Sequence, residues 1–193
     1  MNLAVVKYNA GNLHSVRLAL RRLEIDPLVT DNPEELRTAD KVIFPGVGEA
    51  SSAMAYLRER RLDKLLVSLR QPVLGICLGL QLMCAHTEEN DTQGLGIFPV
   101  QVRRFPATDK VPHMGWNSLI RLKGRLFAGV QEESYVYFVH SYYAEQNKFS
   151  TATCVHSLTF SAAMEKDNFF ALQFHPEKSA AVGEKILRNF LSL

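Results

Sequence analysis

Short apolar segments alternate with helical patterns through the first half of the chain, and this alternation limits the possible folds more than any other feature. The short apolar segments at residues 3–6, 28–29 and 42–44 are typical of buried strands. Apolar residues at helical spacing cover 13–23, Asn32 is expected to cap the next helix, and further helical patterns continue to about Leu69. Such alternation predicts a parallel sheet with helices on both of its faces.

The second half of the chain has a different pattern, in which strand-like segments follow one another with turn residues, and not helices, between them. They cover residues 100–104, 117–122, 135–143, 151–155, 158–164 and 169–174. We expect these strands to add to the sheet in antiparallel fashion, and a final helix over 180–191 to begin after Ser179 as its cap. The sequence thus predicts an α/β fold with a central, mostly parallel, twisted sheet, flanking helices and antiparallel strand additions.

Length and composition fit one globular domain over residues 1–193. The 193 residues are 47% hydrophobic and 22% charged, which is ordinary for a folded domain. The net charge is only +2, with 22 basic residues dispersed among 20 acidic ones. This balance argues against nucleic acid as a partner.

The chain shows neither a secretory signal nor a membrane segment. Its N-terminus lacks the basic start and apolar run of a signal, and its apolar runs fall short of the ~18 residues of a membrane span. The cysteines, Cys77, Cys84 and Cys154, are odd in number and lack zinc-ligand spacing. We therefore expect a cytoplasmic protein without a metal site.

The strongest local motif is a buried strand that runs into a helix through Gly75-Ile76-Cys77-Leu78-Gly79. This Gly-x-Cys-x-Gly pattern is typical of a nucleophile elbow with sulfur in place of a serine oxygen. The glycines remove side chains that would collide with neighbouring elements, and the start of a helix favours the thiolate. The same pattern taken alone is also compatible with a buried structural cysteine.

A base for this nucleophile is available in His175-Pro176-Glu177. Pro176 biases His175 toward extended backbone, in which alternate side chains face the same way. Glu177 can therefore hold the tautomer and orientation of the His175 ring. An isolated histidine is more often structural. His140 is an alternative base, but no carboxylate follows it at this spacing.

A glycine-rich loop, Gly46-Val47-Gly48, follows the strand-like segment at 42–44. Its backbone N–H groups would lie at the carboxyl end of the sheet, where open α/β folds bind ligands. One of them, with the N–H of Leu78, could stabilise an oxyanion. Taken alone, the loop is equally compatible with phosphate binding or a plain turn. Cys84, expected on the same helix that follows Cys77, and Cys154, in a strand-like segment, are predicted to be core residues.

Three segments in this order and spacing closely resemble the triad-type (class I) glutamine amidotransferases: 45–48, 75–81 and 175–177. The resemblance implies a flavodoxin-like fold and hydrolysis of glutamine through a γ-glutamyl thioester, with no cofactor. It implies Cys77 as nucleophile, His175 as base and Glu177 as its orienting carboxylate. It also implies that Gly48 and Gln81 hold glutamine. The amino-acid end of glutamine would lie against Ser141 and Tyr142.

Within that family, segments 8–12, 112–117 and 137–142 resemble the glutaminase subunits that serve histidine biosynthesis. This resemblance implies a heterodimer with a (β/α)₈-barrel cyclase subunit, HisF, which uses the ammonia to make imidazole glycerol phosphate and AICAR. The residues implied to face the partner are Asn12, Met114, Trp116 and Lys178. The sequence departs from the usual pattern at Ala10 and Glu49.

Other functions stay open at this point. One is a glutaminase subunit for another acceptor, such as in anthranilate, aminodeoxychorismate or pyridoxal phosphate synthesis, against which segment 112–117 argues. Another is a cysteine hydrolase acting alone, because the same elbow occurs in esterases and peptidases. A third is a binding protein with a vestigial site, against which the filled triad argues. We further expect the 46–48 loop to act as a switch that the partner controls.

Overall fold

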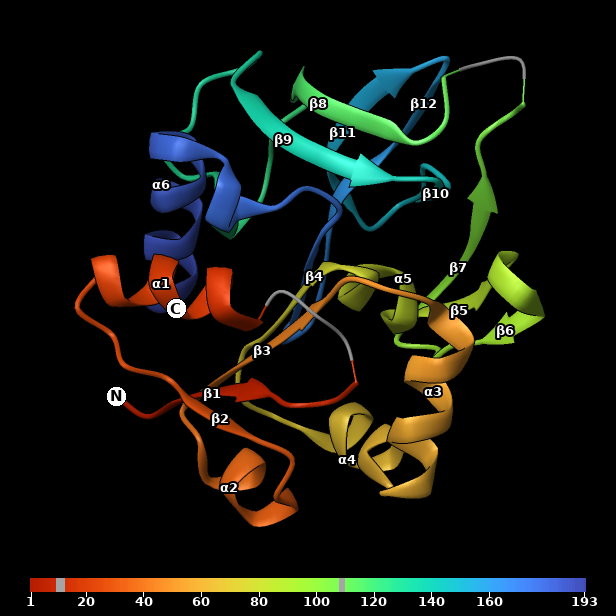
Figure 1. Cartoon of the computed structure of the whole chain (residues 1–193). Coiled ribbons are helices and arrows are strands. Elements are labelled where there is room, and N and C mark those ends of the chain that lie inside the picture. Colours follow the sequence, from red (N-terminus) through yellow and green to blue (C-terminus); the bar gives the residue numbers. More distant parts are fainter. Residues whose placement is uncertain (10–12, 108–109) are drawn as a thin grey trace.

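The computed structural model describes residues 1–9, 13–107 and 110–193. A seven-stranded sheet with the order β11-β12-β13-β4-β3-β1-β2 runs through its centre (Figure 1). Its strands are β1 (Leu3–Val6), β2 (Leu28–Thr30), β3 (Lys41–Gly46), β4 (Val73–Cys77), β11 (Ser150–His156), β12 (Leu158–Lys166) and β13 (Phe169–Leu172).

Five neighbouring strands of this sheet, β2, β1, β3, β4 and β13, pair in parallel. Counted along the chain, their order is the 2-1-3-4-5 order of flavodoxin-like sheets. The strands β12 and β11 add to one edge in antiparallel fashion. Both features confirm the predicted α/β architecture.

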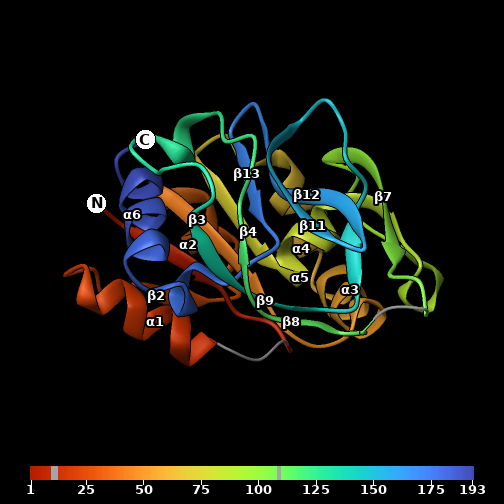
Figure 2. The same ribbon diagram turned by 90° about the horizontal axis from the view of Figure 1, so that it is seen from above.

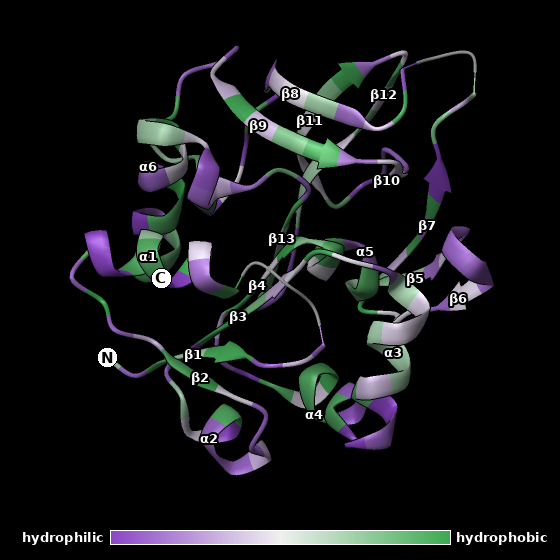
Figure 3. Cartoon of the chain, in the orientation of Figure 1, coloured by the Kyte–Doolittle hydropathy of each residue, from purple (hydrophilic) through white to green (hydrophobic). Residues whose placement is uncertain are grey.

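Helices cover both faces of the sheet (Figure 2). The helices α1 and α6 contribute to one hydrophobic cluster, and α2, α3 and α4 contribute to the other. The bounds are α1 (Leu13–Arg22), α2 (Pro33–Thr38), α3 (Ala50–Glu59), α4 (Leu62–Ser68), α5 (Leu78–Met83) and α6 (Ala180–Leu191). In Figure 3 the strand β1 of the central sheet is hydrophobic, whereas much of α2 is hydrophilic. Burial on two faces explains why the parallel strands read as continuous apolar runs.

Two smaller sheets lie beside the central one. A four-stranded sheet has the order β10-β7-β5-β6, and a two-stranded hairpin pairs β8 with β9. The bounds are β5 (Cys84–Thr87), β6 (Thr92–Gln93), β7 (Phe98–Arg104), β8 (His113–Ser118), β9 (Tyr135–His140) and β10 (Tyr142–Ala144).

Three details of the sequence-based prediction were wrong. The strand expected over 117–122 lies earlier, at β8, where all six residues pair with β9. The single strand expected over 135–143 is broken at Ser141, because β9 pairs with β8 while β10 pairs with β7. The helix after the elbow ends at Met83, so Cys84 has extended backbone and opens β5.

The two expected helix starts differ in outcome. The side chain of Asn32 accepts the backbone N–H of Glu34 and caps α2, as predicted. The side chain of Ser179 does not cap α6. Its hydroxyl instead donates to the carbonyl of His175 at 2.6 Å and accepts the N–H of Tyr137 at 2.9 Å. Ser179 thus ties the start of α6 to the segment that contains His175.

Across the described ranges of the chain, no helix is both long and apolar enough to cross a membrane.

Candidate active site

Cys77 lies where β4 meets α5, with backbone angles φ 54° and ψ −107°. Positive φ is a strained conformation for a residue with a side chain, and it is found at nucleophile elbows. The turn closes tightly: a Cβ on Gly79 would lie 2.0 Å from the carbonyl oxygen of Phe44, and one on Gly75 would lie 2.8 Å from Met83 Sδ. Both glycines are therefore required by the packing of α5 against β3 and β4.

The glycine-rich loop begins directly beside the nucleophile. In the parallel pair of β3 and β4, Gly46 is the register partner of Cys77. Gly48 follows with φ 124°, a conformation that favours glycine. Glu49 then caps α3 by accepting the N–H groups of Ser51 and Ser52. The departure from the family pattern at Glu49 thus provides the helix cap that ends the loop.

His175 is held in place by its backbone and by its ring. It has extended backbone, its N–H donates to the carbonyl of Tyr137 at 2.9 Å, and its carbonyl accepts the Ser179 hydroxyl. Its Nδ1 lies 2.8 Å from Glu177 Oε1, and both side chains are only 1% exposed. Because the glutamate accepts at Nδ1, Nε2 is the nitrogen left to exchange a proton with Cys77.

The charges of the triad favour a protonated histidine. Burial acts to lower the pKa of His175, but its interactions with Cys77 and then with Glu177 outweigh this effect, so that the pKa is raised. An imidazolium beside the sulfur stabilises a thiolate. This geometry supports Cys77 as the candidate nucleophile.

Cys77 opens into a pocket of about 390 Å³, a volume that suits a small ligand. The pocket is lined by Val47, Gly48, Cys77, Leu78, Gln81, Glu89, Pro112, Val139, His140, Ser141 and Tyr142. All the residues expected to bind glutamine are among these except Gly46. That glycine is buried at the end of β3, where a Cβ would collide with the Tyr8 hydroxyl.

Two residues of the site were missed by the sequence analysis. Glu89 is a half-buried acid in the pocket wall; it accepts the N–H of Ala50 at 2.8 Å, and burial raises its pKa. Gln173 is fully buried, and its Nε2 donates to Cys77 Sγ at 3.8 Å. Glu89 lies in a short turn without periodicity, so no sequence pattern marked it. Gln173 lies two residues before His175, and that nearness was the only available signal.

The alternative base, His140, is engaged on both ring nitrogens. Its Nδ1 donates to the carbonyl of Tyr142 at 2.7 Å, and its Nε2 lies 3.0 Å from His113 Nδ1. Burial lowers the pKa of His140 to about 3. His140 is therefore poorly suited to exchange a proton with Cys77.

The other two cysteines are inert core residues. Cys84 and Cys154 have no exposed surface, and neither lines the pocket. Burial raises the thiol pKa of both, that of Cys154 to about 12.

The residues expected to face a partner lie on the outside of the β8–β9 hairpin and next to it. Met114 is 60% exposed and Trp116 is 52% exposed, both on β8. The ring of Trp116 meets that of Tyr137 at 6.2 Å between centroids, and Lys178 Nζ lies 5.7 Å from the Tyr137 ring. These residues form one surface. The expected contact at Asn12, and the departure at Ala10, lie outside the described residues.

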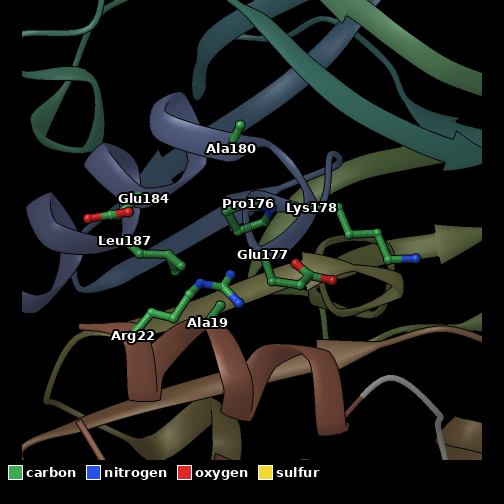
Figure 4. A pocket seen from close by; sticks show the side chains of 8 residues that line it. All are labelled: Ala19, Arg22, Pro176, Glu177, Lys178, Ala180, Glu184 and Leu187. Atoms are coloured by element: carbon green, nitrogen blue, oxygen red, sulfur yellow. The ribbon is translucent and has the colours of Figure 1, made fainter. Parts of the chain in front are cut away.

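A second hollow, of about 310 Å³, lies on the other side of Glu177, between α1 and α6 (Figure 4). It is lined by Arg22 of α1 and Glu184 of α6, among others. Lys178 points away from both of these side chains (Figure 4). The triad is thus flanked by two hollows, and only the larger one contains the nucleophile.

Comparison with known proteins agrees with this geometry. Residues 4–193 match the family model of "Glutamine amidotransferase class-I". The chain is 55% identical to imidazole glycerol phosphate synthase subunit HisH of Bacteroides thetaiotaomicron and 44% identical to that of Escherichia coli K12, each over 100% of both proteins. Among solved structures, a glutamine amidotransferase from Thermotoga maritima has a TM-score of 0.65 at 16% identity, over 100% of this chain and 83% of that one.

The structural likeness supports the fold, and the sequence identities support a closer relation. A family model over nearly the whole chain and full-length relatives at 44–55% identity agree with each other. The chain belongs to the class I glutamine amidotransferases and, within them, to the HisH family of imidazole glycerol phosphate synthase subunits.

Proposed function

We propose that this chain hydrolyses glutamine to glutamate and ammonia, and that it supplies the ammonia to the synthesis of imidazole glycerol phosphate in histidine biosynthesis. The relatives at 44–55% identity support this assignment. The single observation that carries the chemistry is the backbone strain at Cys77, which lies in a pocket beside a buried His175–Glu177 pair.

The first half of the reaction forms a thioester. The Cys77 thiolate attacks the side-chain carbonyl carbon of glutamine, and the carbonyl oxygen takes up negative charge. The N–H of Leu78 and an N–H of the 46–48 loop stabilise that oxyanion. The His175 imidazolium gives its proton to the departing nitrogen, so ammonia leaves and the γ-glutamyl group stays on sulfur.

The second half of the reaction releases glutamate. Neutral His175 takes a proton from water, and the hydroxide formed attacks the thioester carbon. The carbon–sulfur bond breaks, the thiolate is restored, and His175 is again an imidazolium. Glu177 keeps Nδ1 engaged throughout, so that Nε2 performs both transfers.

The pocket supplies groups for both ends of glutamine. Cys77 and Gly48 lie in the wall that would receive the amide. Glu89 is the acid of the pocket, and its carboxylate suits the α-ammonium group of an amino acid. Ser141 and Tyr142 line the same pocket, and we assign the amino-acid end of the substrate to them.

We propose that the partner is HisF, the cyclase with a (β/α)₈-barrel fold, and that the two form a heterodimer. The exposed surface of Met114, Trp116 and Lys178 supports an interface there, because large apolar side chains at a rim of polar groups are typical of binding surfaces. By sequence resemblance alone, we also propose Asn12 as an interface residue. Ammonia would then pass directly into the barrel.

We further propose that the chain works as a single glutamine amidotransferase domain in the cytoplasm. One family model over residues 4–193 supports a single domain. The three free, buried thiols suit a reducing compartment.

The test separates glutamine hydrolysis from synthesis in the assembled enzyme. Cys77→Ala is expected to abolish product formation from glutamine, because the nucleophile is gone. Product formation from added ammonium salt is expected to persist, because it bypasses the glutaminase site. Both rates are measured with the complex verified by size-exclusion chromatography. Loss of the ammonium-dependent rate in an intact complex would overturn the proposed division of labour.

A further inference from the structure

Gln173 presents its amide to the catalytic sulfur in one definite orientation. Its Nε2 donates to Cys77 Sγ at 3.8 Å, and its Oε1 accepts from Gln81 Nε2 at 3.2 Å. Gln173 is fully buried and Gln81 nearly so, at 5% exposed. Rotating the Gln173 amide by half a turn would place an oxygen against the thiolate and two NH₂ groups against each other. The orientation of Gln81 therefore determines which end of Gln173 meets the sulfur.

The orientation of Gln81 is itself determined by a backbone carbonyl. Gln81 Nε2 lies 2.9 Å from the carbonyl oxygen of Tyr142. A carbonyl can only accept, so the nitrogen end of Gln81 must face it. The same carbonyl accepts a second hydrogen bond from His140 Nδ1 at 2.7 Å. Gln81 and His140 thus hold the Tyr142 carbonyl from two directions.

The donor at His140 fixes the tautomers of two histidines. With its proton on Nδ1, neutral His140 accepts at Nε2 from His113 Nδ1, at 3.0 Å. His113 then accepts at Nε2 from Asn117 Nδ2, at 3.2 Å. The other Nδ2 hydrogen of Asn117 goes to the carbonyl of Val155, and its Oδ1 accepts the N–H of Ser118. Burial lowers the pKa of His113 to about 4 and that of His140 to about 3, which keeps both rings neutral.

These bonds form one continuous network in which His140 and Gln81 donate to the Tyr142 carbonyl from two directions, while Gln81 also donates to Gln173. We call it the relay: Asn117, His113, His140, the Tyr142 carbonyl, Gln81 and Gln173. It begins on β8, where side chains alternate between the two faces. His113 faces inward and is 5% exposed, whereas its neighbour Met114 and Trp116 face outward at 60% and 52%. One strand therefore carries both the start of the relay and the proposed partner surface.

We propose that Gln173 is a positioning residue that stabilises the Cys77 thiolate, and that the rest of the relay holds its amide in the donating orientation. The proposal rests on the proposed function in that Cys77 is the glutaminase nucleophile. An N–H bond to an ionised acceptor is stronger than one to a neutral acceptor, so the donor favours thiolate over thiol. The titratable groups that also act on Cys77 are His175, with Glu177 behind it, and Tyr8.

The first experiment measures the thiolate without glutamine. Alkylation of the full-length chain by iodoacetamide is followed against pH, with the modified site identified by peptide mass spectrometry. Cys84 and Cys154 are fully buried and stay unmodified in the folded protein. Gln173→Met keeps the length of the side chain and removes the donor. Its midpoint for Cys77 alkylation is expected to rise by about one pH unit, a tenfold loss of thiolate below the midpoint.

The second experiment tests the far end of the relay. His113→Phe keeps an aromatic ring against Phe138 and His156, whose ring centroids lie 4.7 and 4.2 Å away, but it removes the donor to His140. His156→Phe is the matched control, because His156 stacks on His113 without belonging to the relay. His113→Phe is expected to raise the alkylation midpoint and lower kcat for glutamine severalfold with little change in KM. His156→Phe is expected to match the wild type in all three.

His113→Asn provides a rescue, because its amide can still donate to His140. Its alkylation midpoint is expected to lie nearer the wild type than that of His113→Phe. The proposal is overturned if Gln173→Met leaves the midpoint unchanged, or if the His113→Phe and His156→Phe variants behave alike. Should the wild type fail to hydrolyse glutamine with its partner, the proposed function fails instead, while the alkylation midpoints still decide the relay.

Discussion

At the scale of single residues, the strain at Cys77 and the burial of His175 point to the same function. A φ of 54° is unfavourable for cysteine and is retained because the glycines on either side let β4 and α5 meet closely. His175 and Glu177 are almost fully buried yet form a polar pair at 2.8 Å. A strained backbone next to a buried polar pair is typical of catalytic sites rather than of structural ones.

Glu177→Gln tests the electrostatic part of the triad. Glutamine can still accept from His175 Nδ1, so the ring keeps its orientation, but the negative charge that helps to raise the pKa of His175 is lost. We expect kcat for glutamine hydrolysis to fall on the order of 10² or more, with the fold retained. Steady-state kinetics and far-UV circular dichroism check this. Activity within about threefold of wild type would show that Glu177 only positions the ring.

The sequence suggested the residues that we propose to react, and it missed two that the structure brings beside them. Cys77 and His175 lie in short motifs whose spacing has a mechanical meaning, so they could be predicted. Glu89 reaches the pocket only because a turn after β5 lies against the start of α3, where it accepts the N–H of Ala50. Gln173 matters through contacts with Gln81, 92 positions away in sequence. Such contacts depend on tertiary packing and leave no local pattern.

At the scale of elements, the loop between β3 and α3 is the segment best suited to control turnover. Gly46 pairs with Cys77, and Gly48 has a φ of 124° with nothing within 4 Å of where a Cβ would lie. A small rearrangement of this loop would turn an N–H toward or away from the oxyanion. Removing one such donor typically costs ~10²–10³ in rate, enough to act as a gate.

Gly48→Ala is therefore expected to lower kcat for glutamine by roughly 10² in the assembled enzyme, because alanine disfavours this backbone conformation and displaces the loop. Gly96→Ala is the matched control. Gly96 also has positive φ, at 70°, and open space around it, but it lies between β6 and β7 and does not line the pocket. Steady-state kinetics of both variants check this, and equal losses of kcat would rule out the loop as a gate.

Helices and strands could be predicted where their burial produces a regular pattern of apolar residues in the sequence. The parallel strands are covered on both faces, so they read as apolar runs, and α6 spans the expected residues. The strand β8 was misplaced because one of its faces is exposed and carries Met114 and Trp116. Large apolar residues on an outer surface obscure the alternation that identifies a strand.

At the scale of the whole molecule, the pocket and the proposed interface lie on two sides of one hairpin. Val139 and His140 of β9 line the pocket, while Met114 and Trp116 of β8 face outward. His113 pairs with His140, and Met114 pairs with Val139. A partner bound to the outer face would therefore contact β8, and β8 pairs directly with the strand β9 that lines the pocket. Binding of the partner could change the active site through this one pair of strands.

The most direct test of the account is the release of glutamate from glutamine by the assembled enzyme carrying single cysteine substitutions. Cys77→Ser is expected to release no glutamate above background, because the oxygen nucleophile is far less ionised than sulfur at neutral pH. Cys84→Ala and Cys154→Ala are expected to keep most of the activity, with stability losses of about 1 kcal/mol from small core truncations. Substantial glutamate release by Cys77→Ser, or its loss in folded Cys84→Ala, would contradict the assignment of Cys77 as the nucleophile.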